Sequence, residues 1–263
     1  MRERGAGRGE REDVAVVSVA ARIGFVAAFI AVVGVVWLAR RGADELHRFR
    51  SDDPTVWEAE IREFERAAAE RPPSPSAVVV IGASTVRFWE TADEDLAPLE
   101  VVRRGFGGAK VSDVAHYAER LVSPRPAAVM LAIGGNDLFD LAGNDPRTPE
   151  QVATSIEQLV GKLRTLHPDV PVYFVSIRPP ILDPQGRDPS SQVNARVRAF
   201  ADATAGVEYV DANGELYGAD GTLREGMLDW DRTQLSREGY RVWARPIRER
   251  LVRDLVPLTA SVP

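Results

Sequence analysis

The chain has 263 residues, of which 44% are hydrophobic and 27% charged, with a formal net charge of -6 and no cysteine. This composition is typical of one globular domain of ordinary core size that carries an appendage. The lack of cysteine excludes disulfides, thiolate chemistry and cysteine-ligated zinc, and the acidic balance argues against nucleic acid as the main partner.

The N-terminal region predicts a membrane anchor. Residues 1–13 are polar and glycine-rich, and we expect them to be disordered. Residues 14–39 are apolar apart from Ser18 and Arg22, and the unbroken apolar run 23–39 contains 17 residues. At 1.5 Å per residue such a run covers roughly 25 Å, close to the hydrocarbon thickness of a bilayer. We therefore predict a single transmembrane helix over residues 14–39.

The residues after this span fit an anchor at an interface. Trp37 and the pair Arg40 and Arg41 are typical of the membrane boundary, and residues 40–53 are predicted to form a charged juxtamembrane connector. A cleaved signal peptide is the alternative, but the segment offers no small-x-small cleavage site. Four arginines on each side of the span leave its orientation open by the positive-inside rule. A single N-terminal anchor before a large domain more often exports that domain, so we expect a single-pass protein with an extracytoplasmic domain.

From residue 54 onward, strand-like and helix-like segments alternate. The predicted strands are four short runs dense in β-branched residues, at 77–82, 127–134, 170–177 and 206–212, and a weaker run at 99–104. The predicted helices are one that begins near Pro54 and four that follow, at 111–122, 149–166, 191–203 and 237–255. This alternation predicts a parallel sheet covered on both faces, a three-layer α/β/α sandwich formed by one domain over residues 54–263. Ligands of such sheets bind at the carboxyl ends of the strands.

Two candidate site segments follow the first two predicted strands. Ser84 comes directly after the strand 77–82, where a hydroxyl can enter the crevice and helix N-terminal amides can stabilise negative charge. The alternative for this residue is an ordinary helix-capping serine. Gly107 and Gly108 follow the strand 99–104 and allow backbone N–H groups to approach a ligand closely, although a glycine-rich turn is as often only a turn.

Two more candidates lie further along the chain. Asn136 follows the strand 127–134 after two glycines, and its amide can donate a hydrogen bond into the same crevice or simply stabilise the turn. Asp231 and Gln234 precede the last helix, for which Ser236 is a plausible N-cap.

Together, these segments resemble the SGNH or GDSL-type hydrolase family from about Trp57 to the C-terminus. The matching blocks are "GASTVRFW", "RGFGGAKVSDVAHYAERL", "AIGGNDL" and "SIRPP". The resemblance is closest to bacterial members with a "GSSSIRxW" first block. It implies a flavodoxin-like sheet and the hydrolysis of a small ester or acylated substrate without a cofactor.

The resemblance also implies a role for each matching residue. Ser84 would be the nucleophile, and its backbone N–H, the N–H of Gly108 and the side-chain amide of Asn136 would form an oxyanion hole. Asp231 matches the aspartate that orients a catalytic histidine. Gln234 stands where that histidine is expected.

Gln234 puts the activity in question. A serine hydroxyl is a poor nucleophile until a neighbouring base removes its proton, and histidine does so because its pKa lies near neutrality. A glutamine amide accepts hydrogen bonds but cannot take that proton or pass it to a leaving alcohol. Asp231 is the remaining candidate base, and its ordinary pKa makes it a weak one.

The three histidines of the chain are poor substitutes. His47 lies beside the predicted anchor, and His167 lies at a predicted helix end. His116 points almost opposite the apolar face of its helix, so we expect it to be solvated.

Three hypotheses follow from the sequence. The chain is a slow ester hydrolase that uses an unusual base, or a pseudoenzyme that binds an acyl, acetyl or glycan ligand, or an envelope protein in which only the scaffold matters. A fourth possibility is that Gln234 marks a variant of a complete enzyme. We expect no metal, because no His, Asp and Glu cluster has ligand spacing, and the sequence does not indicate an oligomeric state.

Overall fold

The computed structural model describes residues 47–48, 50–139, 145–179, 189–218, 220–230 and 232–256. The predicted disordered segment 1–13 and the predicted anchor 14–39 lie outside the described residues. Among the residues that are described, no helix is both long and apolar enough to cross a membrane. The secondary-structure elements belong to one compact unit, Phe49–Pro263.

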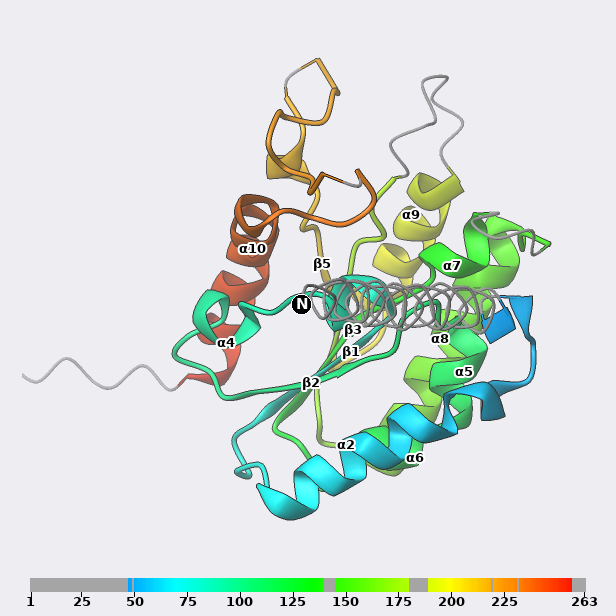
Figure 1. Cartoon of the computed structure of the whole chain (residues 1–263), viewed down its shortest axis with the longest axis vertical. Coiled ribbons are helices and arrows are strands. Elements are labelled where there is room, and N and C mark those ends of the chain that lie inside the picture. The colour runs from blue at the N-terminus through cyan, green and yellow to red at the C-terminus, as the bar shows by residue number, and fades with distance from the viewer. Residues whose placement is uncertain are drawn as a thin grey trace, which may run out of the picture. The chain divides into compact units, whose positions relative to one another are not determined.

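The centre of this unit is a parallel sheet of five strands, in the order β2-β1-β3-β4-β5 (Figure 1). The strands are β1 (Val78–Gly82), β2 (Val101–Gly105), β3 (Ala128–Ala132), β4 (Val172–Val175) and β5 (Val207–Val210). Each lies within a predicted strand or one residue beyond it, so the parallel α/β prediction is confirmed. The strand order is the one found in flavodoxin-like sheets.

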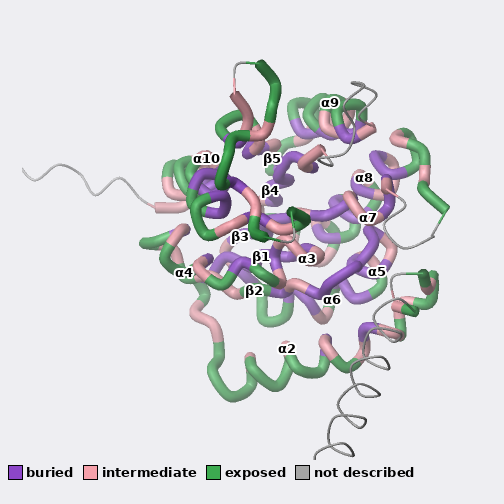
Figure 2. Tube along the Cα trace, turned by 45° about the horizontal axis from the view of Figure 1, so that its top comes forward, coloured by how far each residue is buried: buried purple, intermediate pink, exposed green. Residues whose placement is uncertain are grey.

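Successive residues of the central strands point into two separate cores. Val79 and Ile81 of β1 belong to one hydrophobic cluster, whereas Val78 and Val80 belong to the other. All five residues of β1 are buried, as the purple tube at the centre of Figure 2 shows. A strand with no solvated face reads as an unbroken apolar run because side chains alternate between two covered faces.

Helices cover both faces of the sheet and complete the three layers (Figure 1). The helices that pack on the Val79 side are α2 (Glu58–Glu70), α5 (Val111–His116), α6 (Ala118–Leu121), α7 (Gly135–Leu138), α8 (Pro149–Leu166) and α9 (Pro189–Asp202). The helices that pack on the Val80 side are α3 (Ser84–Arg87), α4 (Ala92–Asp95) and α10 (Arg237–Leu255). The predicted helix 111–122 is divided in two at Tyr117, whose ψ of 9° departs from helical geometry.

The two longest helices, α8 and α10, each begin directly after a residue whose side chain caps the first turn. The Thr148 side chain accepts a hydrogen bond from Gln151 N, and the Gln151 side chain accepts one from Thr148 N, a reciprocal capping box before α8. Ser236 caps α10 by accepting from Gly239 N at 3.0 Å. Both predicted boundaries are therefore confirmed, because a cap fixes where the orphan amides of a first turn find partners.

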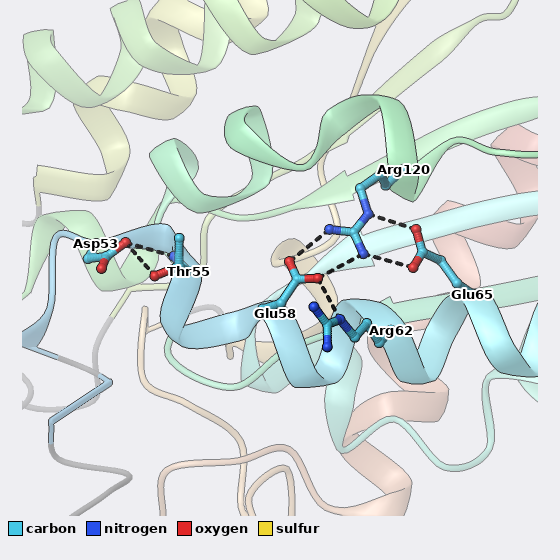
Figure 3. A network of polar contacts seen from close by, with 6 residues as sticks. All are labelled: Asp53, Thr55, Glu58, Arg62, Glu65 and Arg120. Carbon is cyan, nitrogen blue, oxygen red and sulfur yellow. Dashed lines mark hydrogen bonds and ion pairs between the residues drawn. The ribbon is translucent and has the colours of Figure 1, made fainter.

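Helix α2 is joined to α6 by a charged cluster (Figure 3). Arg120 of α6 donates to Glu58 at 2.8 Å and to Glu65 at 2.7 Å, so one guanidinium joins two turns of α2. Its hydrogen bonds, followed by those of Arg62, lower the pKa of Glu58 to about 2. Ser51 and Asp52 precede α2 in the chain, and both are bound by Lys110. The Lys110 ammonium contacts the Asp52 carboxylate at 2.7 Å and the Ser51 carbonyl at 3.0 Å. The end of the predicted connector thus packs on the domain.

Candidate functional site

Ser84 lies at the carboxyl edge of the sheet, where β1 turns into α3. Strand β1 ends at Gly82 and α3 begins at Ser84, with Ala83 in the N-cap position. Ser84 is therefore not a capping serine, and no described residue exchanges a hydrogen bond with its hydroxyl. Its half-buried side chain lines a crevice of about 580 Å³. The hydroxyl is thus available to a molecule that enters this crevice.

Close backbone packing fixes the short helix that carries Ser84. A Cβ added to Gly105, the last residue of β2, would lie 2.3 Å from the Arg87 nitrogen. A Cβ added to Gly82 would lie 2.5 Å from the Ala132 oxygen. From the other side, the Tyr240 hydroxyl of α10 donates to the Thr85 carbonyl at 2.9 Å. Only glycine at these strand ends allows α3 to rest directly on the sheet.

Asn136 lines the same crevice from α7 (Gly135–Leu138), which follows β3. Its amide Nδ2 donates to the Ala109 carbonyl at 2.9 Å. The neighbouring Asp137 accepts from Val111 N at 3.0 Å through Oδ2. The two adjacent side chains therefore bind both ends of one short backbone segment after β2, and so hold α7 and that loop together.

The carboxyl group of Asp137 is buried at the base of this connection. Its side chain is 2% exposed, and its Oδ1 has no hydrogen-bond partner among the described residues. Burial raises the pKa of Asp137 to about 6, which the hydrogen bond from Val111 N only partly offsets. Burial also raises the pKa of Asp113, which accepts from Lys110 N in the same loop.

Gly108 lies in this loop but is not among the described residues that line the crevice. It is buried and has a φ of 80°, a left-handed conformation that favours glycine. The residue after it, Ala109, is the hydrogen-bond partner of Asn136. The structure thus places Gly108 next to the site without bringing it to the crevice wall.

Gln234 enters the crevice from the segment before α10. Its half-buried side chain lines the cavity together with Ser84 and Asn136. Its backbone carbonyl accepts from Asp229 N at 3.0 Å, and Leu228 and Leu235 form a β-bridge across the segment. Asp231, the predicted orienting carboxylate, lies outside the described residues. Three of the five predicted site residues are therefore brought together in one cavity.

Neither of the two histidines of the domain, His116 and His167, lines this crevice. His47 and His116 are exposed, as predicted for His116 from its helical position. His167 is half-buried and its Nε2 lies 3.3 Å from the Val122 carbonyl. Within the described ranges, no group of three or more His, Asp or Glu side chains is arranged to hold a metal ion.

Arg178, for which the sequence predicted no role, also lines the crevice. It follows β4, and its Nη2 donates to the Thr233 carbonyl at 2.8 Å. Burial lowers the pKa of Arg178. The signal that could have found it is the sheet-edge rule that selected Ser84, because "SIRPP" follows the fourth predicted strand.

A second, larger groove of about 1100 Å³ lies beside the crevice. The two cavities share Pro179 and Arg232 in their walls. Tyr209 and Tyr217 contribute aromatic surface to this groove, and most of its other lining is polar or small. Arg232 has a φ of 57°, an uncommon value for a residue other than glycine.

Comparisons with known proteins agree with this architecture. The model of the GDSL-like lipase/acylhydrolase family matches residues 82–242. Among curated protein sequences, no relative matches the chain.

Several solved structures share the fold. A GDSL-like lipase from Bacteroides thetaiotaomicron is 19% identical, with a TM-score of 0.59 over 74% of this chain and 100% of that one. A family 3 carbohydrate esterase from Clostridium thermocellum is 19% identical, with a TM-score of 0.55 over 68% of this chain and 96% of that one. A carbohydrate esterase family 3 protein from Talaromyces cellulolyticus is 18% identical, with a TM-score of 0.53 over 68% and 98%.

Proposed function

The chain belongs to the GDSL-like lipase/acylhydrolase family, and we propose that its crevice is an ester-hydrolysing site with Ser84 as the nucleophile. One observation carries this proposal. The Ser84 hydroxyl, which no described residue engages, lines the same cavity as the Asn136 amide and the Gln234 side chain. A nucleophile, a hydrogen-bond donor and a third polar group around one space are the parts that acyl transfer requires.

Two hydrogen-bond donors, the Ser84 backbone N–H and the Asn136 amide, would stabilise the oxyanion that forms when Ser84 attacks an ester carbonyl. The N–H of Ser84 lies in the first turn of α3 and so lacks an intrahelical acceptor. The Asn136 amide is fixed by its hydrogen bond to Ala109, so little reorganisation is needed when charge develops. We propose that Gly108 assists from the adjacent loop, as the family resemblance suggests.

Gln234 is the reason why we propose that ester hydrolysis at Ser84 is slow. It can position the Ser84 hydroxyl through a hydrogen bond, but it cannot remove the proton or return it to the leaving alcohol. In serine hydrolases, removal of the histidine lowers turnover on the order of a million-fold, and roughly a thousand-fold acceleration over water survives from the oxyanion hole and binding. We therefore propose slow turnover, with Asp231 as the base directly or through water.

The alternative function is binding without turnover. The same crevice then holds an acyl, acetyl or glycan ligand, and Gln234 contributes a hydrogen bond in place of proton transfer. The observation that favours this alternative is Gln234 itself, because a glutamine cannot transfer a proton whereas the Ser84 hydroxyl and the Asn136 amide still line the crevice.

The cavities support a small acyl group on a polar carrier. The crevice of about 580 Å³ suits a short acyl chain. The adjoining groove of about 1100 Å³, with its polar and tyrosine lining, suits a hydroxylated leaving group. Two structures that share the fold are carbohydrate esterases, which is consistent with this substrate class.

We also propose that residues 14–39 anchor the domain to a membrane, with the domain on the extracytoplasmic side. The support is the apolar run in the sequence. Fractionation of cells that express the full chain tests this: the protein should pellet with membranes and resist alkaline extraction. Recovery of the protein in the soluble fraction would refute the anchor.

Hydrolysis of 4-nitrophenyl acetate by the purified full chain tests the catalytic proposal. A slow rate that disappears in Ser84→Ala and falls in Asn136→Ala would support it. Equal rates for the wild type and Ser84→Ala would refute it. In that case, binding of an acetylated sugar by the wild type would support the non-catalytic alternative.

A further inference from the structure

Arg178 brings a positive charge into the crevice of Ser84. Its guanidinium has five N–H donors. Among the described residues, its one hydrogen-bond partner is the Thr233 carbonyl, which Nη2 reaches at 2.8 Å. The side chain is half-buried. Most of its donors are therefore left for whatever occupies the cavity.

The described part of the chain does not compensate this charge. Arg120, Arg196 and Arg250 each form ion pairs with carboxylates, and their pKa values are raised. Arg178 forms no ion pair with any described residue, and burial lowers its pKa. An arginine that is withdrawn from water without a carboxylate partner costs free energy, and an anionic ligand in the crevice would offset that cost.

The other walls of the crevice reinforce this sign of charge. None of the described lining residues is an Asp or a Glu. Arg232 adds a second guanidinium where the crevice meets the larger groove, and the carboxylates Asp211, Glu225 and Asp229 line the groove and not the crevice. The whole chain has a net charge of -6, so this cationic cavity does not follow from the overall composition.

We propose that the ester that enters the crevice carries an anionic group, a carboxylate, phosphate or sulfate, and that Arg178 binds it. This inference rests on the proposed ester-hydrolysing function and names the substrate class of the same site. Guanidinium groups bind such oxyanions through paired hydrogen bonds. The interaction gains strength in a partly desolvated cavity, where charges are less screened than in bulk water.

Arg178 also contacts the segment that carries Gln234, through Thr233. Loss of the guanidinium therefore affects every substrate to some extent by loosening that segment. Only a comparison between matched anionic and neutral substrates separates recognition of charge from this structural contribution.

The test uses 4-acetoxybenzoate, which is anionic, and its neutral methyl ester. The ratio of their kcat/KM values is measured for the full chain, for Arg178→Met, and for the control Arg62→Met on the exposed side of α2. The same set is repeated in the Gln234→His background to raise the signal. We expect the anionic-to-neutral ratio to fall about 10- to 100-fold in Arg178→Met, as for hydrogen bonds to charged groups, and to stay constant in Arg62→Met.

The outcomes separate the two proposals. If both esters are hydrolysed and the ratio does not change in Arg178→Met, the anionic preference is refuted while the hydrolase proposal stands. If neither ester is hydrolysed in either background, the hydrolase proposal fails, and calorimetric binding of 4-acetoxybenzoate decides the inference. Binding that weakens at least about 10-fold in Arg178→Met supports it, and equal or undetectable binding overturns it.

Discussion

Replacement of Gln234 by histidine is the most direct test of how the crevice works. Gln234 shares the cavity with Ser84 and Asn136, and its backbone is held by hydrogen bonding to Asp229. Gln234→His should therefore introduce an imidazole beside the Ser84 hydroxyl without moving the segment. The substitution supplies the one group that the described crevice lacks for proton transfer.

The expected gain can be bounded. A positioned general base contributes about 10²- to 10⁴-fold, and removal of histidine from a complete triad costs about 10⁶-fold. At about 1.4 kcal/mol per tenfold, these values correspond to a barrier lowered by about 3 to 8 kcal/mol. Because the new imidazole must also be oriented, we expect a rise in kcat/KM of about 10²- to 10⁴-fold.

The assay is the initial rate of 4-nitrophenyl acetate hydrolysis between pH 5 and 9. In Gln234→His, the rate should rise with pH through a transition near about 6.5, the ordinary pKa of histidine, and the wild type should lack that transition. Gln234→Leu serves as the matched control, because it changes the cavity without adding a base. Ser84→Ala in the Gln234→His background should remove the gain.

A folded Gln234→His protein with no increase in rate would refute this reasoning. Folding is checked by an unchanged melting temperature. The result would mean that position 234 lies outside the roughly 3 Å reach that proton transfer requires. The crevice would then be a binding site in which one substitution cannot restore catalysis.

Three further outcomes are expected from the packing and charge of the site. Gly105→Ala should lower the free energy of unfolding, measured in urea, by about 1–3 kcal/mol, the usual range for overpacking, and should lower any Ser84-dependent activity. Its control is Gly161→Ala, whose added Cβ has nothing within 4 Å and which should raise the free energy of unfolding by about 0.5–1 kcal/mol. The Asp137 carboxyl has a raised pKa of about 6, so its protonated form is favoured in the folded state and the protein loses stability as pH rises from about 4 to 6. Asp137→Asn should therefore raise the free energy of unfolding by up to about 3 kcal/mol above pH 6 and leave it unchanged near pH 3.5. Equal gains at both pH values would contradict this. A fluorophosphonate probe should label Ser84 slowly in the wild type, and rapid labelling would reveal a base that the structure does not describe.

The sequence was sufficient to predict the sheet because its signals are local. Runs dense in β-branched residues marked four of the strands and a weaker run marked β2, and the cap Ser236 marked the start of α10. The division of the predicted helix 111–122 at Tyr117 was not predictable, because side-chain periodicity continues through a single residue whose backbone departs from helical geometry.

The candidate site was predictable only where a motif follows a strand. The carboxyl-end rule found Ser84 and Asn136, and the resemblance to a family found Gln234. The position of Gly108 outside the crevice wall depends on how the loop after β2 folds against α7, which spacing along the chain does not encode. Arg178 was missed because an arginine after a strand is usually solvated, and only its burial without a carboxylate marks it as unusual.

These features together argue against a crevice that serves only as a scaffold. A scaffold gains nothing from an arginine held in a cavity without a carboxylate partner among the described residues, because an apolar side chain of similar size would pack there at lower cost. Nor does it require a β2 that ends in a glycine so that α3 can present Ser84 to that cavity. Local rules are broken where a function compensates for the cost, and here they are broken on both sides of the same space. The proposed binding of an anionic ester would therefore explain more of the molecule than the fold alone, and in that proposal Gln234 determines whether the ester is cleaved and at what rate.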